Sequence, residues 1–168
     1  MSTETDHSPR LRVLVIGGTQ FIGRATTSAL LAVGTDLTLL NRGRTPSPFE
    51  DEPIRTVLCD RYSAGFAAFL ESEPPWDAIV DFAAFAPDDL LPIINLGRRA
   101  GLYIFISSDS VYQACAPVGF VLGPNGFLTE ESSAQRDAAR AIEDEYGANK
   151  LSCEELLRRH VVRPVVHT

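Results

Sequence analysis

The chain joins an apolar run to two glycines and a helical pattern in the stretch Leu11-Arg12-Val13-Leu14-Val15-Ile16-Gly17-Gly18-Thr19-Gln20-Phe21-Ile22-Gly23-Arg24. Glycine permits a tight strand-to-helix turn, and the absent side chain at Gly17 lets phosphates approach the backbone. Free N–H groups at the start of the following helix stabilise negative charge. The missing Cβ at Gly23 lets helix and strand pack closely. The stretch therefore predicts a site for a dinucleotide pyrophosphate, and an ordinary strand-turn-helix is the alternative interpretation.

A second predicted strand at residues 35–40 completes a βαβ unit, because residues 25–33 carry apolar side chains at helical spacing. In such units an acid at the end of the second strand binds the ribose 2′-hydroxyl, whereas an arginine there accommodates a 2′-phosphate. Asp36 lies at the beginning of this strand, while Asn41 and Arg42 follow its end. The sequence therefore favours NADP over NAD. The alternative is that the arginines here are solvated loop charges.

Strands and helices continue to alternate along the rest of the chain. Strands are predicted at residues 54–59, 77–82, 102–106 and 161–166, and helices at residues 63–71, 87–99 and 135–159. We expect Gly101 to cap the helix at 87–99, the helical region at 135–159 to break near Tyr146 and Gly147, and residues 113–133 to form a loop where a substrate enters. The order predicts an α/β fold of three αβα layers, a doubly wound parallel sheet of the Rossmann type.

Length and composition place the chain among soluble globular proteins of one domain. Its 168 residues are enough for a sizeable core, and no apolar run approaches the roughly 18 residues of a membrane span. Residues 1–10 are polar and predict a disordered leader. A net charge of −7 argues against broad binding of nucleic acid or anionic membranes. Cys59, Cys115 and Cys153 are odd in number and form no metal-ligand spacing with the histidines, which favours reduced thiols in the cytoplasm.

Polar and small residues gather after the predicted strands. Ligands of parallel sheets bind at the carboxyl ends of the strands, so residues that follow different strands share one edge. The residues that follow the first five strands are Gly17, then Asn41 and Arg42, Asp60 and Arg61, Phe82, Ala83 and Ala84, and lastly Ser107 and Ser108. Their agreement predicts a common binding site at this edge.

Tyr146 and Lys150 are candidates for proton transfer. They are four residues apart in a predicted helix, so their side chains are neighbours. The Lys150 ammonium would stabilise the Tyr146 phenolate, which makes the phenol a usable proton donor and acceptor near neutral pH. Ser108 could hydrogen-bond a substrate oxygen and complete the proton path. A surface pair that arose by chance is the alternative.

Taken together, these motifs resemble those of extended or atypical short-chain dehydrogenase/reductases, specifically the NAD-dependent epimerase/dehydratase family. The resemblance covers residues 12–164 and rests on Gly-Gly-Thr-Gln-Phe-Ile-Gly-Arg, Leu-Leu-Asn-Arg-Gly-Arg, Cys-Asp-Arg, Val-Asp-Phe-Ala-Ala-Phe, Ile-Ser-Ser-Asp-Ser-Val-Tyr, Tyr-Gly-Ala-Asn-Lys and Val-Arg-Pro. Members of the family oxidise a sugar hydroxyl to a keto intermediate and then return or redirect the hydride. The resemblance therefore implies an NAD(P)-dependent oxidoreductase.

The resemblance also implies roles for individual residues. Ser108, Tyr146 and Lys150 match the catalytic set, and Lys150 would also hold the nicotinamide ribose. Asp60 would contact the adenine amine, and Ala83 and Ala84 would border the nicotinamide ribose. The full implied set of cofactor-binding residues is Gly17, Gly18, Thr19, Gln20, Phe21, Ile22, Gly23, Asn41, Arg42, Asp60, Arg61, Phe82, Ala83, Ala84, Ser107, Tyr146, Lys150 and Pro164.

Two departures from the family pattern bear on activity. Gln20 replaces the middle glycine of the turn, as in an atypical branch that includes chloroplast stem-loop RNA-binding proteins. Family members continue beyond the sixth strand into a small domain that grips the substrate. We therefore expect residues 11–168 to be a cofactor-binding domain whose substrate domain is missing, with little turnover, and to form a homo-oligomer or be completed by another chain.

Three functions stay open at this point. The first is an epimerase, dehydratase or reductase that acts on a nucleotide sugar or a similar hydroxyl or carbonyl substrate. The second is a non-catalytic module that senses NADP or regulates a partner. The third is RNA binding, which the acidic balance of the chain disfavours.

Overall fold

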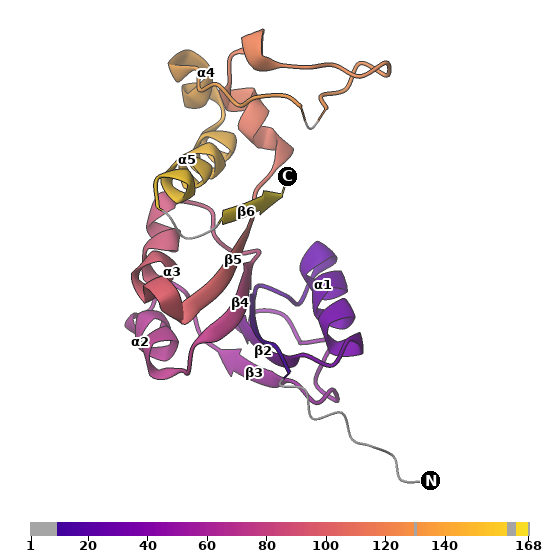
Figure 1. The fold of residues 1–168 in the computed structure, drawn as a ribbon, viewed down its shortest axis with the longest axis vertical. Coiled ribbons are helices and arrows are strands. Elements are labelled where there is room, and N and C mark those ends of the chain that lie inside the picture. Colours follow the sequence, from indigo (N-terminus) through magenta and orange to yellow (C-terminus); the bar gives the residue numbers. More distant parts are fainter. Residues whose placement is uncertain (1–9, 130, 161–163, 168) are drawn as a thin grey trace.

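The computed structural model of the protein describes residues 10–129, 131–160 and 164–167. These residues form a six-stranded parallel sheet in the order β3-β2-β1-β4-β5-β6 (Figure 1). Its strands are β1 (Arg12–Ile16), β2 (Asp36–Asn41), β3 (Arg55–Leu58), β4 (Trp76–Asp81), β5 (Ala100–Ile106) and β6 (Pro164–His167). Because β2 and β4 lie on opposite sides of β1, the chain winds in both directions from the middle of the sheet. The predicted doubly wound Rossmann fold is confirmed.

Helices cover both faces of the sheet. One face carries α1 (Phe21–Ala32), and the other carries α2 (Ala64–Ser72), α3 (Leu91–Leu96) and α5 (Glu145–Arg159), as Figure 1 shows. The shorter α4 (Ala138–Glu143) lies beyond α5. Short 3₁₀-helices form η1 (Pro87–Leu90), η2 (Gly97–Arg99), η3 (Asp109–Ala114) and η4 (Pro117–Gly119). None of the described helices is both long and apolar enough to cross a membrane.

The core follows from the alternation of side chains along buried strands. In β1, Val13 and Val15 join the cluster under α1, whereas Leu14 and Ile16 join the larger cluster under α2, α3 and α5. Every one of these four side chains is buried. Residues 42–54 connect β2 to β3 without a helix, and Phe49 from this segment helps α1 to cover its face. Two buried layers of apolar side chains therefore fix the sheet between its helices.

The predicted helix at residues 87–99 is divided into η1, α3 and η2, and its predicted cap is wrong. α3 ends at Leu96, because Gly97 adopts a left-handed conformation with φ of +54° and ends the helix. Gly101 lies inside β5 instead, where a Cβ would lie 2.7 Å from the carbonyl oxygen of Asp77 on the neighbouring strand. This glycine permits close strand approach and caps no helix.

The helical region predicted at residues 135–159 divides at Asp144, two residues before the predicted position. The Asp144 carboxylate accepts a hydrogen bond from Gly147 N at 3.1 Å and thereby caps α5.

The last strand begins at Pro164, and residues 161–163 of its predicted range lie outside the described residues. Residues 1–9 of the predicted leader also lie outside them. The thiols of Cys59, Cys115 and Cys153 are free, as predicted.

An ionic cluster closes the edge of the sheet where β1, β3 and β4 begin. Arg12 stacks 3.7 Å above the ring of Trp76 and donates to Glu73 Oε2 at 2.5 Å. Arg55 donates to both oxygens of Glu73 at 2.7 Å. The hydrogen bonds from Arg55 lower the pKa of the Glu73 carboxyl. Three strands are therefore tied together at their amino ends.

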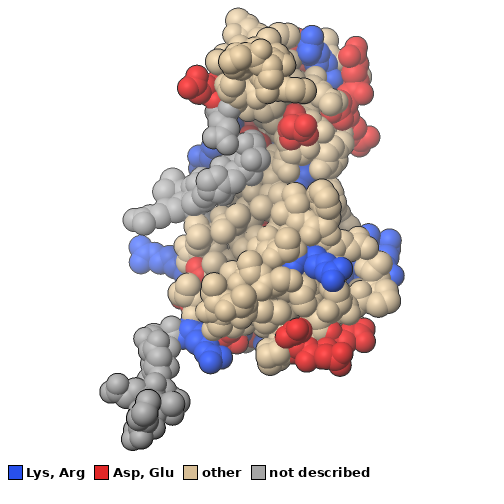
Figure 2. Space-filling model, turned by 90° about the vertical axis from the view of Figure 1, so that its right-hand side faces the viewer, with Lys and Arg blue, Asp and Glu red and all other residues tan. Residues whose placement is uncertain are grey.

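Residues 109–129 and 131–136 form a projecting segment beside α4, drawn in orange in Figure 1. The predicted loop at 113–133 lies within it and contains an antiparallel bridge between Leu122 and Leu128. Figure 2 shows the face at the right of Figure 1, where charged side chains gather toward the margins and most of the middle is uncharged.

Candidate functional site

A cleft of about 340 Å³ lies at the carboxyl ends of β1, β2, β3 and β4. It opens where the strand order reverses between β1 and β4, which is where parallel sheets bind ligands. The predicted cofactor residues that line it are Gly17, Thr19, Gln20, Asn41, Arg42, Asp60, Arg61, Phe82 and Ala83. The structure therefore brings together the residues that follow four of the five strands.

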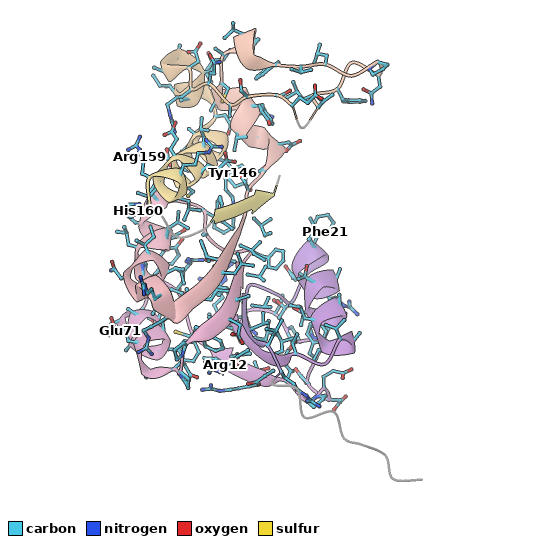
Figure 3. All side chains as sticks on the ribbon, in the orientation of Figure 1. Arg12, Phe21, Glu71, Tyr146, Arg159 and His160 are labelled. Atoms are coloured by element: carbon cyan, nitrogen blue, oxygen red, sulfur yellow. The ribbon has the colours of Figure 1, made fainter. Side chains whose placement is uncertain are left out.

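The turn after β1 leaves the first amides of α1 without side-chain caps. Gly17 has φ of +81° and donates from its amide to the Leu40 carbonyl at 3.0 Å. Gln20 precedes α1, and its side chain makes no capping hydrogen bond. Phe21 has φ of +44°, which is unusual for a residue with a side chain, and its ring is exposed at the end of α1 (Figure 3). A strained turn and free N–H groups are features of an anion-binding helix start.

Two further glycines of the motif serve packing. A Cβ on Gly18 would lie 2.5 Å from Val15 Cγ1 and would also meet the hydroxyl of Thr27. A Cβ on Gly23 would lie 2.7 Å from the carbonyl oxygen of Gly17. Thr27 joins both positions, since its hydroxyl is 3.0 Å from Gly18 O and 2.9 Å from Gly23 O. The expected close packing of helix and strand at Gly23 is therefore observed.

The rim after β2 offers polar groups to the cleft. Asn41 accepts a hydrogen bond from Gly43 N at 2.9 Å, whereas its amide nitrogen is buried without a partner among the described residues. Arg42 and Arg44 line the same rim with exposed side chains. A buried amide donor beside two arginines suits an anionic, hydroxyl-bearing ligand.

A buried ion network lies beneath the cleft. Arg61 donates to both carboxylate oxygens of Asp81, at 3.0 and 3.1 Å, and its Nε lies 3.8 Å from Asp89 Oδ1. Tyr103 donates to Asp81 Oδ2 at 3.0 Å. Burial, reinforced by Asp81, raises the pKa of Tyr103 well above its ordinary value, so Tyr103 stays a protonated donor. Arg61 thus lines the cleft with a guanidinium that already has carboxylate partners.

Lys150 is buried beside the cleft and anchored to β5 and to the segment that follows β4. Its Nζ donates to the carbonyl of Ala84 at 2.8 Å and to that of Ile106 at 2.7 Å. Desolvation by burial lowers the pKa of Lys150. An ammonium carries three N–H donors, so these carbonyls leave one for another acceptor. The ring centres of Phe85 and Phe105 lie 5.1 and 4.6 Å from Nζ.

Tyr146 lies on the same face of α5 as Lys150, as the spacing predicts. Its ring centre is 6.0 Å from Lys150 Nζ and 6.2 Å from the centre of Phe85. Figure 3 shows Tyr146 at the end of α5 that lies nearer to the projecting segment. α5 can approach η3 because a Cβ on Gly147 would meet the carbonyl oxygen of Ser110. Ser108 caps η3 and accepts from Ser110 N at 3.1 Å.

Several predicted residues lie outside the cleft lining. Gly18 and Gly23 pack inward, Phe21 and Ile22 are exposed, and Ala84 is buried with its carbonyl on Lys150. Ser107 donates to the buried Glu154 at 2.6 Å, and Pro164 pairs with Tyr103 in the sheet. The cleft residues that sequence reasoning missed include Arg44, Thr45, Cys59, Tyr62 and Phe85. Each lies within three residues of a predicted one, and that proximity was the available signal.

Comparison with known proteins finds similarity to the same family as the motifs. The model of the NAD dependent epimerase/dehydratase family matches residues 13–91, which confirms the predicted resemblance over this part of the chain. A curated relative is the chloroplast stem-loop binding protein of 41 kDa b from Arabidopsis thaliana. It is 27% identical in an alignment of 117 residues that covers 62% of this chain and 31% of the relative.

Solved structures share the fold at low identity. The UDP-Glc/GlcNAc 4-epimerase from Campylobacter jejuni superposes with a TM-score of 0.70 and 21% identity, over 93% of this chain and 52% of that one. The dTDP-glucose 4,6-dehydratase from Bacillus anthracis in complex with NAD has a TM-score of 0.66 and 18% identity, over 93% and 53%. The chain thus spans about half the length of these structures.

Proposed function

We propose that the cleft binds NAD or NADP and that the protein is the cofactor-binding part of an epimerase/dehydratase-type oxidoreductase acting on a nucleotide sugar. The observation that carries this proposal is the bond from Lys150 Nζ to the Ala84 carbonyl. Through it the candidate proton-transfer helix α5 is fixed to the segment that lines the cofactor cleft. The free thiols agree with the reducing interior of a cell, so we also propose a cytoplasmic location.

The residues present fit a dinucleotide. The uncapped amides at the start of α1 suit a pyrophosphate, and the unpaired Asn41 amide suits a ribose hydroxyl. Arg42 and Asp60 both line the cleft. The exposed Arg42 would contact a 2′-phosphate, which favours NADP, and Asp60 would contact the adenine amine, as the family resemblance implies. When bound, such a cofactor accepts or donates a hydride at its nicotinamide ring.

The residues around Lys150 would serve proton transfer. Tyr146 is half-exposed and can exchange a proton with a substrate oxygen. The Lys150 ammonium lies 6.0 Å from the centre of the Tyr146 ring, and its remaining N–H can hold a ribose hydroxyl. Ser108 would orient the substrate oxygen from the end of β5. Substrate positioning within about 3–3.5 Å of the hydride donor is required for turnover.

Calorimetric titration with NADPH and NADH tests the cofactor assignment. Gly17→Val should abolish binding of both, because a branched side chain would fill the turn. Gly126→Val is the matched control, since Gly126 has φ of +77° in the projecting segment, with open space around it. Loss of binding in Gly17→Val alone supports the proposal. Equal affinities for wild type and a folded Gly17→Val protein would contradict it.

Nucleotide-sugar chemistry is tested by single-turnover absorbance. The protein is mixed with oxidised cofactor and a panel of nucleotide sugars, and appearance of the reduced nicotinamide is followed. Because the chain is expected to lack a substrate domain, the panel is repeated with the chain extended by such a domain, and cofactor binding without turnover there would favour the non-catalytic NADP-sensing module.

RNA binding is a second candidate because of the similarity to the chloroplast stem-loop binding protein. The net charge of −7 counts against it, and the cleft arginines Arg42 and Arg44 are the cations it would use. A titration with stem-loop RNA at increasing salt separates the two functions, because RNA affinity through phosphate contacts falls steeply with salt.

A further inference from the structure

Arg61 has its hydrogen-bonding capacity directed away from the cleft. A guanidinium carries five N–H donors in a planar fork. Two of them form the bidentate pair with Asp81, and Nη2 also donates to the carbonyl of Asp89 at 2.7 Å. The side chain is 7% exposed and lies over the ring of Phe66. Arg61 is therefore a poor candidate for a cofactor phosphate.

The two carboxylates that pair with Arg61 accept hydrogen bonds from backbone amides of residues 82–86. Asp81 Oδ1 accepts from Ala83 N at 2.8 Å. Asp89 Oδ2 accepts from Phe85 N at 2.7 Å and from Ala86 N at 3.1 Å. Three amides of one short segment are thus bonded to charged acceptors, which form the stronger class of hydrogen bond.

The segment of residues 82–86 connects the cleft to Lys150. Its residues Phe82, Ala83 and Phe85 line the cleft, and its Ala84 carbonyl accepts from Lys150 Nζ. The Phe85 ring also lies against Tyr146. A displacement of residues 82–86 would therefore change the cleft wall and the anchorage of the ammonium together.

We propose that Arg61 is a positioning residue: through Asp81 and Asp89 it fixes residues 82–86, and this segment holds Lys150 and Tyr146 in register with the cofactor cleft. The inference deepens the proposed function and rests on it for its catalytic meaning. The structural arm of its test does not depend on any cofactor.

Lys150 is the only lysine in the sequence, which gives a direct probe of its anchorage. In the cofactor-free protein, mass spectrometry resolves acylation of Lys150 from acylation of the amino terminus. Arg61→Met should speed Lys150 acylation about tenfold or more, because release from Ala84 exposes the amine. Removal of the Arg61 charge alone acts in the opposite direction, since Arg61 is among the groups that lower the pKa of Lys150. A higher pKa leaves less neutral amine, and release from burial also raises the pKa of Lys150, so the acylation rates are compared per fraction of neutral amine across a pH series.

Controls separate local release from general unfolding. Arg136→Met also loses a bidentate ion pair, with Glu155 on α5, and should leave Lys150 acylation unchanged. Amide hydrogen exchange at Phe85 and Ala86 should accelerate in Arg61→Met far more than exchange at Leu14 in β1. The double variant Arg61→Met/Asp81→Asn removes the buried unpaired carboxylate and keeps the test valid if the single variant fails to fold.

A cofactor arm separates positioning from direct contact. ADP carries only the adenosine and pyrophosphate half, so its affinity should stay within about twofold in Arg61→Met, while NADPH affinity falls more than ADP affinity. An ADP affinity reduced about tenfold or more would make Arg61 a direct ligand and overturn the proposal. Unchanged or slower acylation of Lys150 in folded Arg61→Met would overturn it as well. Failure of the wild type to bind either nucleotide contradicts the proposed function, and acylation and exchange still decide the role of Arg61.

Discussion

The ammonium nitrogen of Lys150 lies 6.0 Å from the centre of the Tyr146 ring, although Lys150 is 2% exposed and Tyr146 is 44% exposed. One residue acts from inside the protein, and its neighbour one helical turn earlier faces outward. A buried charge beside an accessible phenol is an arrangement in which the charge is shielded from water while the phenol meets a substrate. Its energetic cost and its chemical use are both measurable.

The burial of Lys150 should make stability rise with pH in the alkaline range. Its pKa is lowered in the folded protein, whereas the unfolded chain has an ordinary value of about 10.4. Between these values the unfolded state binds more protons, so the free energy of unfolding increases as pH rises. Urea unfolding followed by circular dichroism should show wild type gaining stability relative to Lys150→Met as pH approaches about 10.5. A constant difference between the two proteins would contradict the buried charge.

In a chain extended with the substrate domain that the family resemblance implies, Tyr146→Phe should slow hydride transfer by roughly 10²- to 10⁴-fold with little loss of cofactor affinity, because it removes a transferable proton and preserves the ring. Lys150→Met should reduce both quantities, since Lys150 is proposed to hold the cofactor ribose. Single-turnover absorbance and calorimetry provide the two readings. Tyr112→Phe, whose hydroxyl donates to the Ser132 carbonyl outside the cleft, is the control. Wild-type rates in Tyr146→Phe would remove it from the catalytic set.

Gly18→Ala should lower the free energy of unfolding by about 1–3 kcal/mol, because the new methyl group must displace packed core atoms. Those atoms belong to Val15, Thr27 and Leu39. Gly65→Ala in α2 meets atoms no closer than 3.5 Å and should leave stability unchanged or slightly raised. Equal stability of Gly18→Ala and wild type in urea would show that the turn tolerates a side chain.

Arg42→Ala should weaken NADPH binding by about tenfold or more, as for a lost charge-assisted hydrogen bond, and leave NADH affinity within about twofold. Arg98→Ala is the control, because Arg98 is exposed on η2, just before β5 begins. Calorimetric titrations of both cofactors give the ratio directly. An unaltered ratio in Arg42→Ala would exclude Arg42 as the group that selects NADP.

Local patterns were sufficient to predict the sheet and the gathering of residues around a cleft at the carboxyl ends of its strands. The strand, glycine turn and helix of residues 11–32 are encoded in adjacent residues, and so is the spacing of Tyr146 and Lys150. Contacts between distant residues could not be predicted. Arg61 forms hydrogen bonds with Asp81 and Asp89, which are 20 and 28 residues away in the sequence. Lys150 donates to Ala84, which is 66 residues away. The predicted cap at Gly101 was wrong because Gly97, four residues earlier, has the positive φ that ends α3.

Trp76 is the only tryptophan of the protein, and it sits at the amino end of β4 beneath the guanidinium of Arg12. The cleft lies at the other end of this six-residue strand, roughly 16 Å away for an extended chain. Intrinsic fluorescence will therefore report the opening of the edge closed by Arg12 and Glu73. Local disorder of the cleft would not change the Trp76 emission. An unfolding curve recorded by fluorescence would therefore score a protein with a disordered cleft as native.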